Sequence, residues 1–102
     1  MADKKERFEV LGDFLKFHRK SKGFTQWDVA KELGYTSSQF ISNFERGLCA
    51  PSFETLPKLI EMYSIPEKEI LDLLLQQQEK FLREKLFGDA QDREGVGQSV
   101  IA

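Results

Sequence analysis

The segment TQWDVAKELG, residues 25–34, constrains the fold most strongly, because it carries start and stop signals for one short helix. Thr25 is a favourable N-cap residue, and Asp28 three positions later completes a pattern like a capping box. Gly34 is a favourable residue for the end of a helix. The apolar positions between these signals are Val29, Ala30 and Leu33. The segment therefore predicts a short, tightly bounded helix.

Helices are also predicted on both sides of this segment. Residues 8–18 repeat apolar side chains at helical spacing, and Gly23 follows a basic stretch that suits a helix C-terminus. The stretch SSQFISNFERG, residues 37–47, predicts a helix that Thr36 or Ser37 can cap and a glycine ends. Its expected buried stripe is Phe40, Ile41 and Phe44.

Two more helices are predicted toward the C-terminus. Ser52 can cap a helix through LPKLIEMY, but Pro57 predicts either an irregular first turn or a later start. Pro66 opens a fifth helix, which can run to Phe87. Residues 88–102 are rich in Gly, Asp, Gln and Ser without periodicity, which predicts a disordered tail. The expected fold is all-α with five helices.

Length and composition narrow the class of protein. The chain has 102 residues, 40% of them hydrophobic, which suits one domain with a modest core and disfavours an enzyme. No apolar run approaches the roughly 18 residues of a membrane span, and the N-terminus lacks a signal-peptide apolar region. Cys49 is the single cysteine, which excludes an internal disulfide and a cysteine-based zinc site. These features predict a soluble, cytoplasmic protein.

The charge distribution allows a nucleic-acid partner only through a few individual groups. The formal net charge is −2. Residues 1–50 carry two more basic than acidic side chains, whereas residues 51–102 carry four more acidic than basic ones. DNA contact would therefore depend on single cations, uncharged donors and helix N-termini rather than on a broad basic field.

The helix predicted within residues 37–47 has an uncharged polar face. The side chains opposite its apolar stripe are Ser38, Gln39, Ser42 and Asn43. A helix that needed only solubility would usually carry lysine and glutamate there, because these are better helix formers. The composition favours a surface that recognises a partner, and the alternative is that these residues only cap and solvate a surface helix.

The run from Leu11 to about Leu75 resembles the single-domain phage-repressor and Cro type of helix-turn-helix, the family of xenobiotic-response-element regulators. The stretches that carry the resemblance are LGDFLKFHRKSKGFTQ, DVAKELG, FISNFERG and PSFETLPKLIEMYSI. The turn that ends at Ser37 is one residue longer than the commonest version, which shifts the base-reading positions by up to one. The residues that fall in the family's order are Ala30 at the helix crossing, Gly34 in the turn, and inward-facing Ile41 and Phe44.

The resemblance implies that residues 37–47 hold a recognition helix, which enters the DNA major groove by its N-terminal end. Glutamine and asparagine can bond bidentately to adenine, and serine to several base edges. The implied base-reading residues are Ser38, Gln39, Ser42 and Asn43. Gln26 matches a family glutamine that contacts a phosphate, although it can also be a solvated first-turn residue. Other residues implied near the DNA backbone are Lys22, Thr25, Trp27, Ser37 and Arg46, of which Trp27 can instead cover the residue 26–33 helix.

The resemblance also assigns a structural ion pair. Arg19 and Glu45 match the family's arginine and glutamate, which pair between the first and third helices and fix the recognition helix on its scaffold. His18 is expected to be a half-buried core histidine rather than a pH sensor or metal ligand, because no other Cys or His lies nearby. A redox switch at Cys49 is disfavoured. Since no catalytic pair, phosphate loop or triad is found, we expect no enzyme, cofactor or metal.

The fifth helix keeps an apolar stripe beyond the usual end of such a domain. This stripe can fold back on the bundle, form a homodimer seam or bind another protein, and the homodimer is favoured. The expected seam residues are Leu74, Leu75, Gln78, Phe81, Leu82 and Leu86. The expected organisation is an N-terminal arm (1–7), a helix-turn-helix DNA-binding domain (8–75), a helical dimerisation extension (76–87) and the tail (88–102).

The expected function is that of a sequence-specific transcriptional regulator, a dimeric repressor that binds a pseudo-palindromic operator in double-stranded DNA. The alternative is a helix-turn-helix used as a protein-interaction module, such as a transcription adaptor or an antitoxin. DNA binding should weaken steeply with salt, whereas an apolar helix-in-groove contact should not.

Overall fold

The computed structural model describes the backbone of residues 2–88 and the side chains of residues 8–88. Its described part contains no strand and five helices: α1 (Ala2–Ser21), α2 (Gln26–Leu33), α3 (Gln39–Glu45), α4 (Leu56–Tyr63) and α5 (Glu67–Phe87). The predicted all-α fold with a long last helix is confirmed. Residues 89–102, nearly all of the predicted tail, lie outside the described residues.

Helix α2 begins and ends where its local signals predict. The Thr25 hydroxyl accepts a hydrogen bond from the Asp28 backbone N–H at 3.0 Å. The Asp28 carboxylate accepts one from the Thr25 backbone N–H at 2.8 Å. Gly34 then ends the helix with a φ of 86°, a left-handed conformation that a residue without Cβ adopts at little cost. The capping box and the glycine stop are both confirmed.

Helix α3 begins later than predicted. Its N-cap is Ser38 rather than Thr36 or Ser37, and the Ser38 side chain makes no capping hydrogen bond. The Ser37 hydroxyl instead accepts a hydrogen bond from the Gln39 backbone N–H at 3.2 Å. Because serine hydroxyls can satisfy turn backbone groups locally, the connection after α2 continues to Ser38 before the helix starts.

Helix α4 takes the later start that Pro57 allowed. The Ser52 hydroxyl accepts a hydrogen bond from the Thr55 backbone N–H at 3.2 Å, so it closes a turn ahead of α4 instead of capping it. The helix begins at Leu56, and Pro57 lies in its first turn, where its missing N–H is not needed. Pro66 is the N-cap residue of α5, one position before the first-turn place that the sequence predicts for it.

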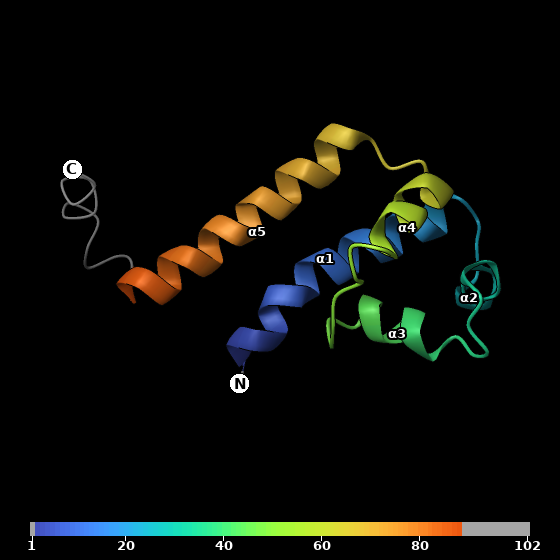
Figure 1. The fold of residues 1–102 in the computed structure, drawn as a ribbon, viewed down its shortest axis with the longest axis horizontal. Helices are drawn as coiled ribbons and strands as arrows, with labels where there is room; N and C mark the ends of the chain where they lie inside the picture. The colour runs from blue at the N-terminus through green and yellow to red at the C-terminus, as the bar shows by residue number, and fades with distance from the viewer. Residues whose placement is uncertain (1, 89–102) are drawn as a thin grey trace.

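Helices α1 and α5 lie side by side and run in opposite directions (Figure 1). The first half of α1 and the second half of α5 extend together, away from α2 and α4. Residues 2–7, which the sequence assigned to an N-terminal arm, belong to α1. This segment holds no Gly or Pro and is rich in good helix formers, so the helix continues through it.

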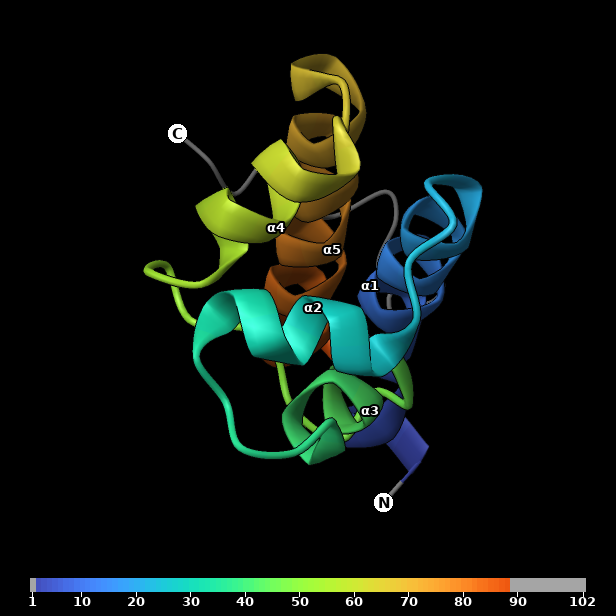
Figure 2. The same ribbon diagram turned by 90° about the vertical axis from the view of Figure 1, so that its right-hand side faces the viewer.

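The core lies where α1 meets the other helices. Helix α3 packs against α1 and against α2, and Figure 2 shows α2 and α3 next to each other in front of α1. The buried apolar side chains come from all five helices and from the loop before α5: Leu11, Leu15, Val29, Ala30, Ile41, Phe44, Leu56, Leu59, Tyr63, Ile65 and Ile70. In residues 2–88, no helix is both long and apolar enough to cross a membrane.

Candidate nucleic-acid interface

The two amide side chains of α3 form one polar surface. Gln39 is exposed and Asn43, one turn later, is partly buried. The Gln39 side-chain N–H donates a hydrogen bond to the Asn43 side-chain oxygen at 2.9 Å. This bond fixes the amides relative to each other and leaves the Gln39 oxygen and the Asn43 N–H groups for an outside partner. The arrangement presents donors and an acceptor together without a charge.

The three serines border this amide pair. Ser37 is exposed, whereas Ser38 and Ser42 are partly buried. Since Ser37 accepts a hydrogen bond from the helix backbone, its hydroxyl can still donate its proton outward. Gln39 is thus the most exposed of the four residues expected to contact bases, and the two partly buried serines have less room for a partner.

The structure corrects the expected apolar stripe of α3. Ile41 and Phe44 are buried at 1% and 6% exposure, but Phe40 is 52% exposed. Its ring centroid lies 4.8 Å from that of Tyr35, with 33° between the ring planes. Tyr35 lies in the connection between α2 and α3, and Phe40 packs on this tyrosine instead of entering the core. Spacing along the helix did not predict this contact.

A network of buried polar groups holds α3 against α1 and α2. Arg19 and Glu45 lie in contact as the family resemblance implied, with the Arg19 Nε 2.6 Å and Nη2 3.0 Å from the two carboxylate oxygens. The Arg19 Nη1 donates a hydrogen bond to the Phe24 carbonyl oxygen at 2.7 Å. The Gln26 side-chain N–H donates to the Glu45 carboxylate at 3.0 Å. One carboxylate of α3 is therefore bound from both neighbouring helices.

The electrostatics of the network favour the charged pair. The hydrogen bond to Glu45 raises the pKa of Arg19 against the opposing effect of burial. Burial is the main cause that raises the pKa of the nearby Tyr63 phenol, and the Glu45 charge adds to it. The described residues contain no buried side-chain nitrogen or oxygen without a hydrogen bond. The scaffold beneath α3 is thus fully paired and resists rearrangement.

The groups expected near the DNA backbone fall into two sets. Lys22, Thr25 and Arg46 are exposed, and Trp27 is 44% exposed at the start of α2. Thr25 uses its hydroxyl as an acceptor for the capping box but keeps the proton as a donor. Gln26, in contrast, is partly buried and bonded to Glu45, a role that neither of its two predicted alternatives included.

The capping box also lowers the charge presented by the start of α2. Hydrogen bonding from Thr25, chiefly from its backbone N–H, lowers the pKa of the Asp28 carboxyl below its ordinary value of 3.8. Asp28 is therefore ionised at neutral pH, and its negative charge offsets the partial positive charge of the helix N-terminus. A phosphate near α2 would depend more on Lys22 and on hydroxyl or amide donors than on the helix dipole.

The residues expected in a seam on α5 lie on two different faces. Leu74 packs against the core of its own chain, and Phe81 is partly buried, with the Lys85 ammonium 5.7 Å from its ring centroid. Leu75, Leu82 and Leu86 are 64%, 42% and 67% exposed, and Gln78 is exposed as well. Leu71, outside the expected set, is 48% exposed.

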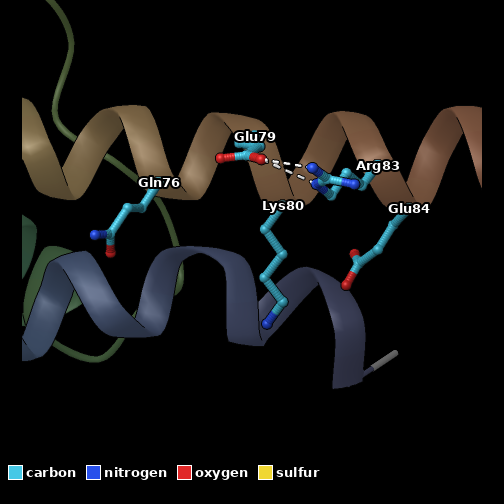
Figure 3. A pocket seen from close by; sticks show the side chains of 5 residues that line it. All are labelled: Gln76, Glu79, Lys80, Arg83 and Glu84. Carbon is cyan, nitrogen blue, oxygen red and sulfur yellow. Dashed lines mark hydrogen bonds and ion pairs between the residues drawn. The ribbon is translucent and has the colours of Figure 1, made fainter. Parts of the chain in front are cut away.

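A shallow depression lies along the polar side of α5, next to the first half of α1 (Figure 3). Its lining residues are Gln76, Glu79, Lys80, Arg83 and Glu84. Glu79 and Arg83 are paired with each other at 2.9 Å, so much of its charge is already neutralised. Its walls are mostly the apolar stems of these long side chains, and they bring no converging donors to a small molecule.

His18 and Cys49 have ordinary surroundings. The His18 ring contacts Phe14 and Phe17 edge-on, and its Nε2 lies 3.2 Å from the Glu69 carboxylate, which joins α1 to α5. Cys49 is a partly buried free thiol in the loop after α3. No cluster of His, Cys, Asp or Glu suited to a metal ion occurs among the described residues.

The chain has the arrangement of a helix-turn-helix protein: a short capped helix (α2), a turn that runs to Ser38, and a second helix (α3) with an uncharged polar face. The chain belongs to the family described as Helix-turn-helix domain, whose model matches residues 12–75. This membership supports DNA binding. Among curated proteins and among solved structures, no match to the chain was found.

Proposed function

We propose that the chain is a sequence-specific transcriptional regulator of the phage-repressor and Cro type, which binds double-stranded DNA through α3. The observation that carries this proposal is the linked, uncharged amide pair of Gln39 and Asn43 on a helix that the Arg19–Glu45 pair fixes from below. A rigid polar face can be matched to base edges without a large ordering cost. The proposed role is binding rather than catalysis, in the cytoplasm.

In this proposal, α3 lies in the major groove with its N-terminal end toward the bases. Gln39 and Asn43 contact base edges, and either amide can make two hydrogen bonds to an adenine. Lys22 and Arg46, both exposed, contact phosphates and supply the sequence-independent part of the affinity. The net charge of the chain is −2 and offers no broad basic field, so direct base contacts must account for a larger share of its affinity.

We further propose that two copies pair through the exposed leucines of α5. Leu71 and Leu75 are four residues apart, as are Leu82 and Leu86, so the stripe is symmetric about its centre. Two copies therefore bring leucine against leucine, whether their α5 helices run parallel in register or antiparallel. A second copy of the chain is the partner that such a self-complementary stripe fits. Such a dimer would bind a pseudo-palindromic operator and repress where the operator overlaps a promoter.

Selection of binding sites from random duplex DNA tests the DNA-binding proposal. A pseudo-palindromic consensus is expected, and binding to it should weaken steeply as salt rises. A scrambled duplex of the same composition serves as the control. If no sequence is enriched and duplex binding does not depend on salt, the proposal is wrong, and a protein-interaction module becomes the better interpretation.

A further inference from the structure

Phe40 is the apolar side chain that the fold leaves next to the amide pair. It follows Gln39 directly and is 52% exposed, although its helix neighbours Ile41 and Phe44 are buried. At about 100° per residue around a helix, Phe40 lies roughly 60° from Asn43. The ring therefore lies between the polar face of α3 and the face of α3 that packs on the core.

Tyr35 holds the Phe40 ring in this position. The two ring centroids are 4.8 Å apart, and Tyr35 is itself partly buried and packed against the core. A stacked aromatic side chain has few rotamers left to lose when it meets a partner. Phe40 is thus a fixed apolar surface beside two hydrogen-bonding amides, rather than a side chain that moves freely in solvent.

We propose that Phe40 recognises the C5-methyl group of a thymine in the major groove, and this inference rests on the proposed DNA-binding function. Among the four bases only thymine carries a methyl group there, and phenylalanine is a suitable apolar contact for it. An A·T pair presents this methyl group on the same groove edge as the adenine atoms that Gln39 or Asn43 would bond. The half-site recognised by α3 therefore contains a thymine at or beside the adenine contact.

Replacement of single thymines by deoxyuridine in the selected operator isolates this contact, because it removes only the methyl group. At one thymine of each half-site we expect the affinity to fall about 4-fold, the factor that corresponds to about 0.8 kcal/mol for one buried CH₂ or CH₃ group. The other thymines should tolerate the replacement. In Phe40→Ala the sensitive thymine should become insensitive, since the contacting ring is gone, and Phe40→Leu should retain part of the effect.

Phe53→Ala is a matched control, because Phe53 is 89% exposed in the loop before α4 and the proposal gives it no contact with a base. This variant should keep the full deoxyuridine effect. The inference is overturned if no thymine is sensitive, or if Phe40→Ala loses as much affinity on deoxyuridine replacement as the unmodified chain does. If no site is selected at all, both the inference and the proposed function are wrong, whereas a selected site without methyl sensitivity removes the inference alone.

Discussion

Gly12 of α1 and Phe44 of α3 approach so closely that a Cβ on Gly12 would lie 2.5 Å from the Phe44 carbonyl oxygen. The same Cβ would lie 2.7 Å from the carbonyl oxygen of Glu45. These atoms are backbone, so they cannot move aside as the end of a flexible side chain can. The two helices therefore meet through their backbones, and this contact sets how far α3 stands from its scaffold.

Gly12→Ala should destabilise the protein. Alanine in a helix interior would gain about 0.5–1 kcal/mol over glycine, but overpacking against rigid backbone typically costs about 1–3 kcal/mol, so the net effect should be a loss. Urea denaturation gives the free energy of unfolding. The control is Asp13→Ala, at an exposed position of the same helix, which should change it little. A Gly12→Ala protein as stable as the parent would mean that α1 and α3 can separate without cost.

The Arg19–Glu45 pair should behave as one unit. Glu45→Leu leaves the Arg19 charge unpaired, and Arg19→Met leaves the carboxylate buried, so each should cost about 3–5 kcal/mol of unfolding free energy. The double variant removes both charges and should cost less than either single change. Chemical denaturation of the four proteins completes the cycle. If the loss of unfolding free energy in the double variant equals the sum of the losses in the two single variants, the two side chains do not depend on each other.

How much could be predicted from the sequence depended on how local each signal was. Thr25 and Gly34 determine the ends of α2 through their own neighbours, so the prediction agreed with the structure. Phe40 packs on Tyr35, which lies in the connection before α3, and helix spacing does not consider such a contact. The Arg19–Glu45 contact joins residues 26 positions apart, and only the family resemblance suggested it.

The two faces of α5 could not be separated for a similar reason. Which face of α5 is covered depends on α1, and α1 extends back to Ala2. The first residues of α1 form a charged segment with little hydrophobic periodicity. A prediction that places only an arm there groups Leu74 and Phe81 with leucines that the structure leaves exposed. The direction of a long amphipathic helix depends on what it packs against, and that is a long-range property.

Asp28 should make stability depend on pH at the acid end. Its folded pKa is lowered below 3.8, so the ionised carboxylate stabilises the capping box above this value, and the contribution is lost as the pH falls through the folded pKa. The difference in melting temperature between the parent and Asp28→Ala should therefore be present at pH 6 and shrink below about pH 3.8. Glu32→Ala, in the same helix but outside the cap, is the control. A difference that is constant with pH would contradict the prediction.

The amide pair and the exposed cations should have separable effects on DNA binding. Gln39→Ala or Asn43→Ala should cost about 1–3 kcal/mol of specific binding for each lost bidentate contact, with non-specific binding nearly unchanged. Arg46→Ala or Lys22→Ala should weaken all sequences alike and reduce the salt slope by about one unit for each lost phosphate contact. Titrations on operator and scrambled duplex at several salt concentrations measure both quantities. If both amide variants discriminate between operator and scrambled duplex as well as the parent does, these side chains are not base contacts.

The exposed leucines of α5 should control dimerisation without affecting the fold. Leu82 and Leu86 are 42% and 67% exposed, so Leu82→Glu with Leu86→Glu leaves the inner face of the helix intact. In a dimer the same changes would bury charges, which is costly, and the equilibrium should shift to monomer in sedimentation. A control with the same change in net charge is Gln76→Glu with Lys80→Gln, on the polar side of α5 (Figure 3), which should remain dimeric.

The same pair of variants connects dimerisation to operator binding. A dimer would contact two half-sites about 34 Å apart or a multiple of that distance, and linking the second contact to the first can raise the affinity by roughly 10² to 10⁴. The leucine variant should therefore lose much of its affinity for the full operator but keep its affinity for an isolated half-site, because only the full operator uses the linkage. If it sediments as a dimer and binds the full operator normally, the copies meet elsewhere, and the α5 leucines then remain as a surface for a different protein partner.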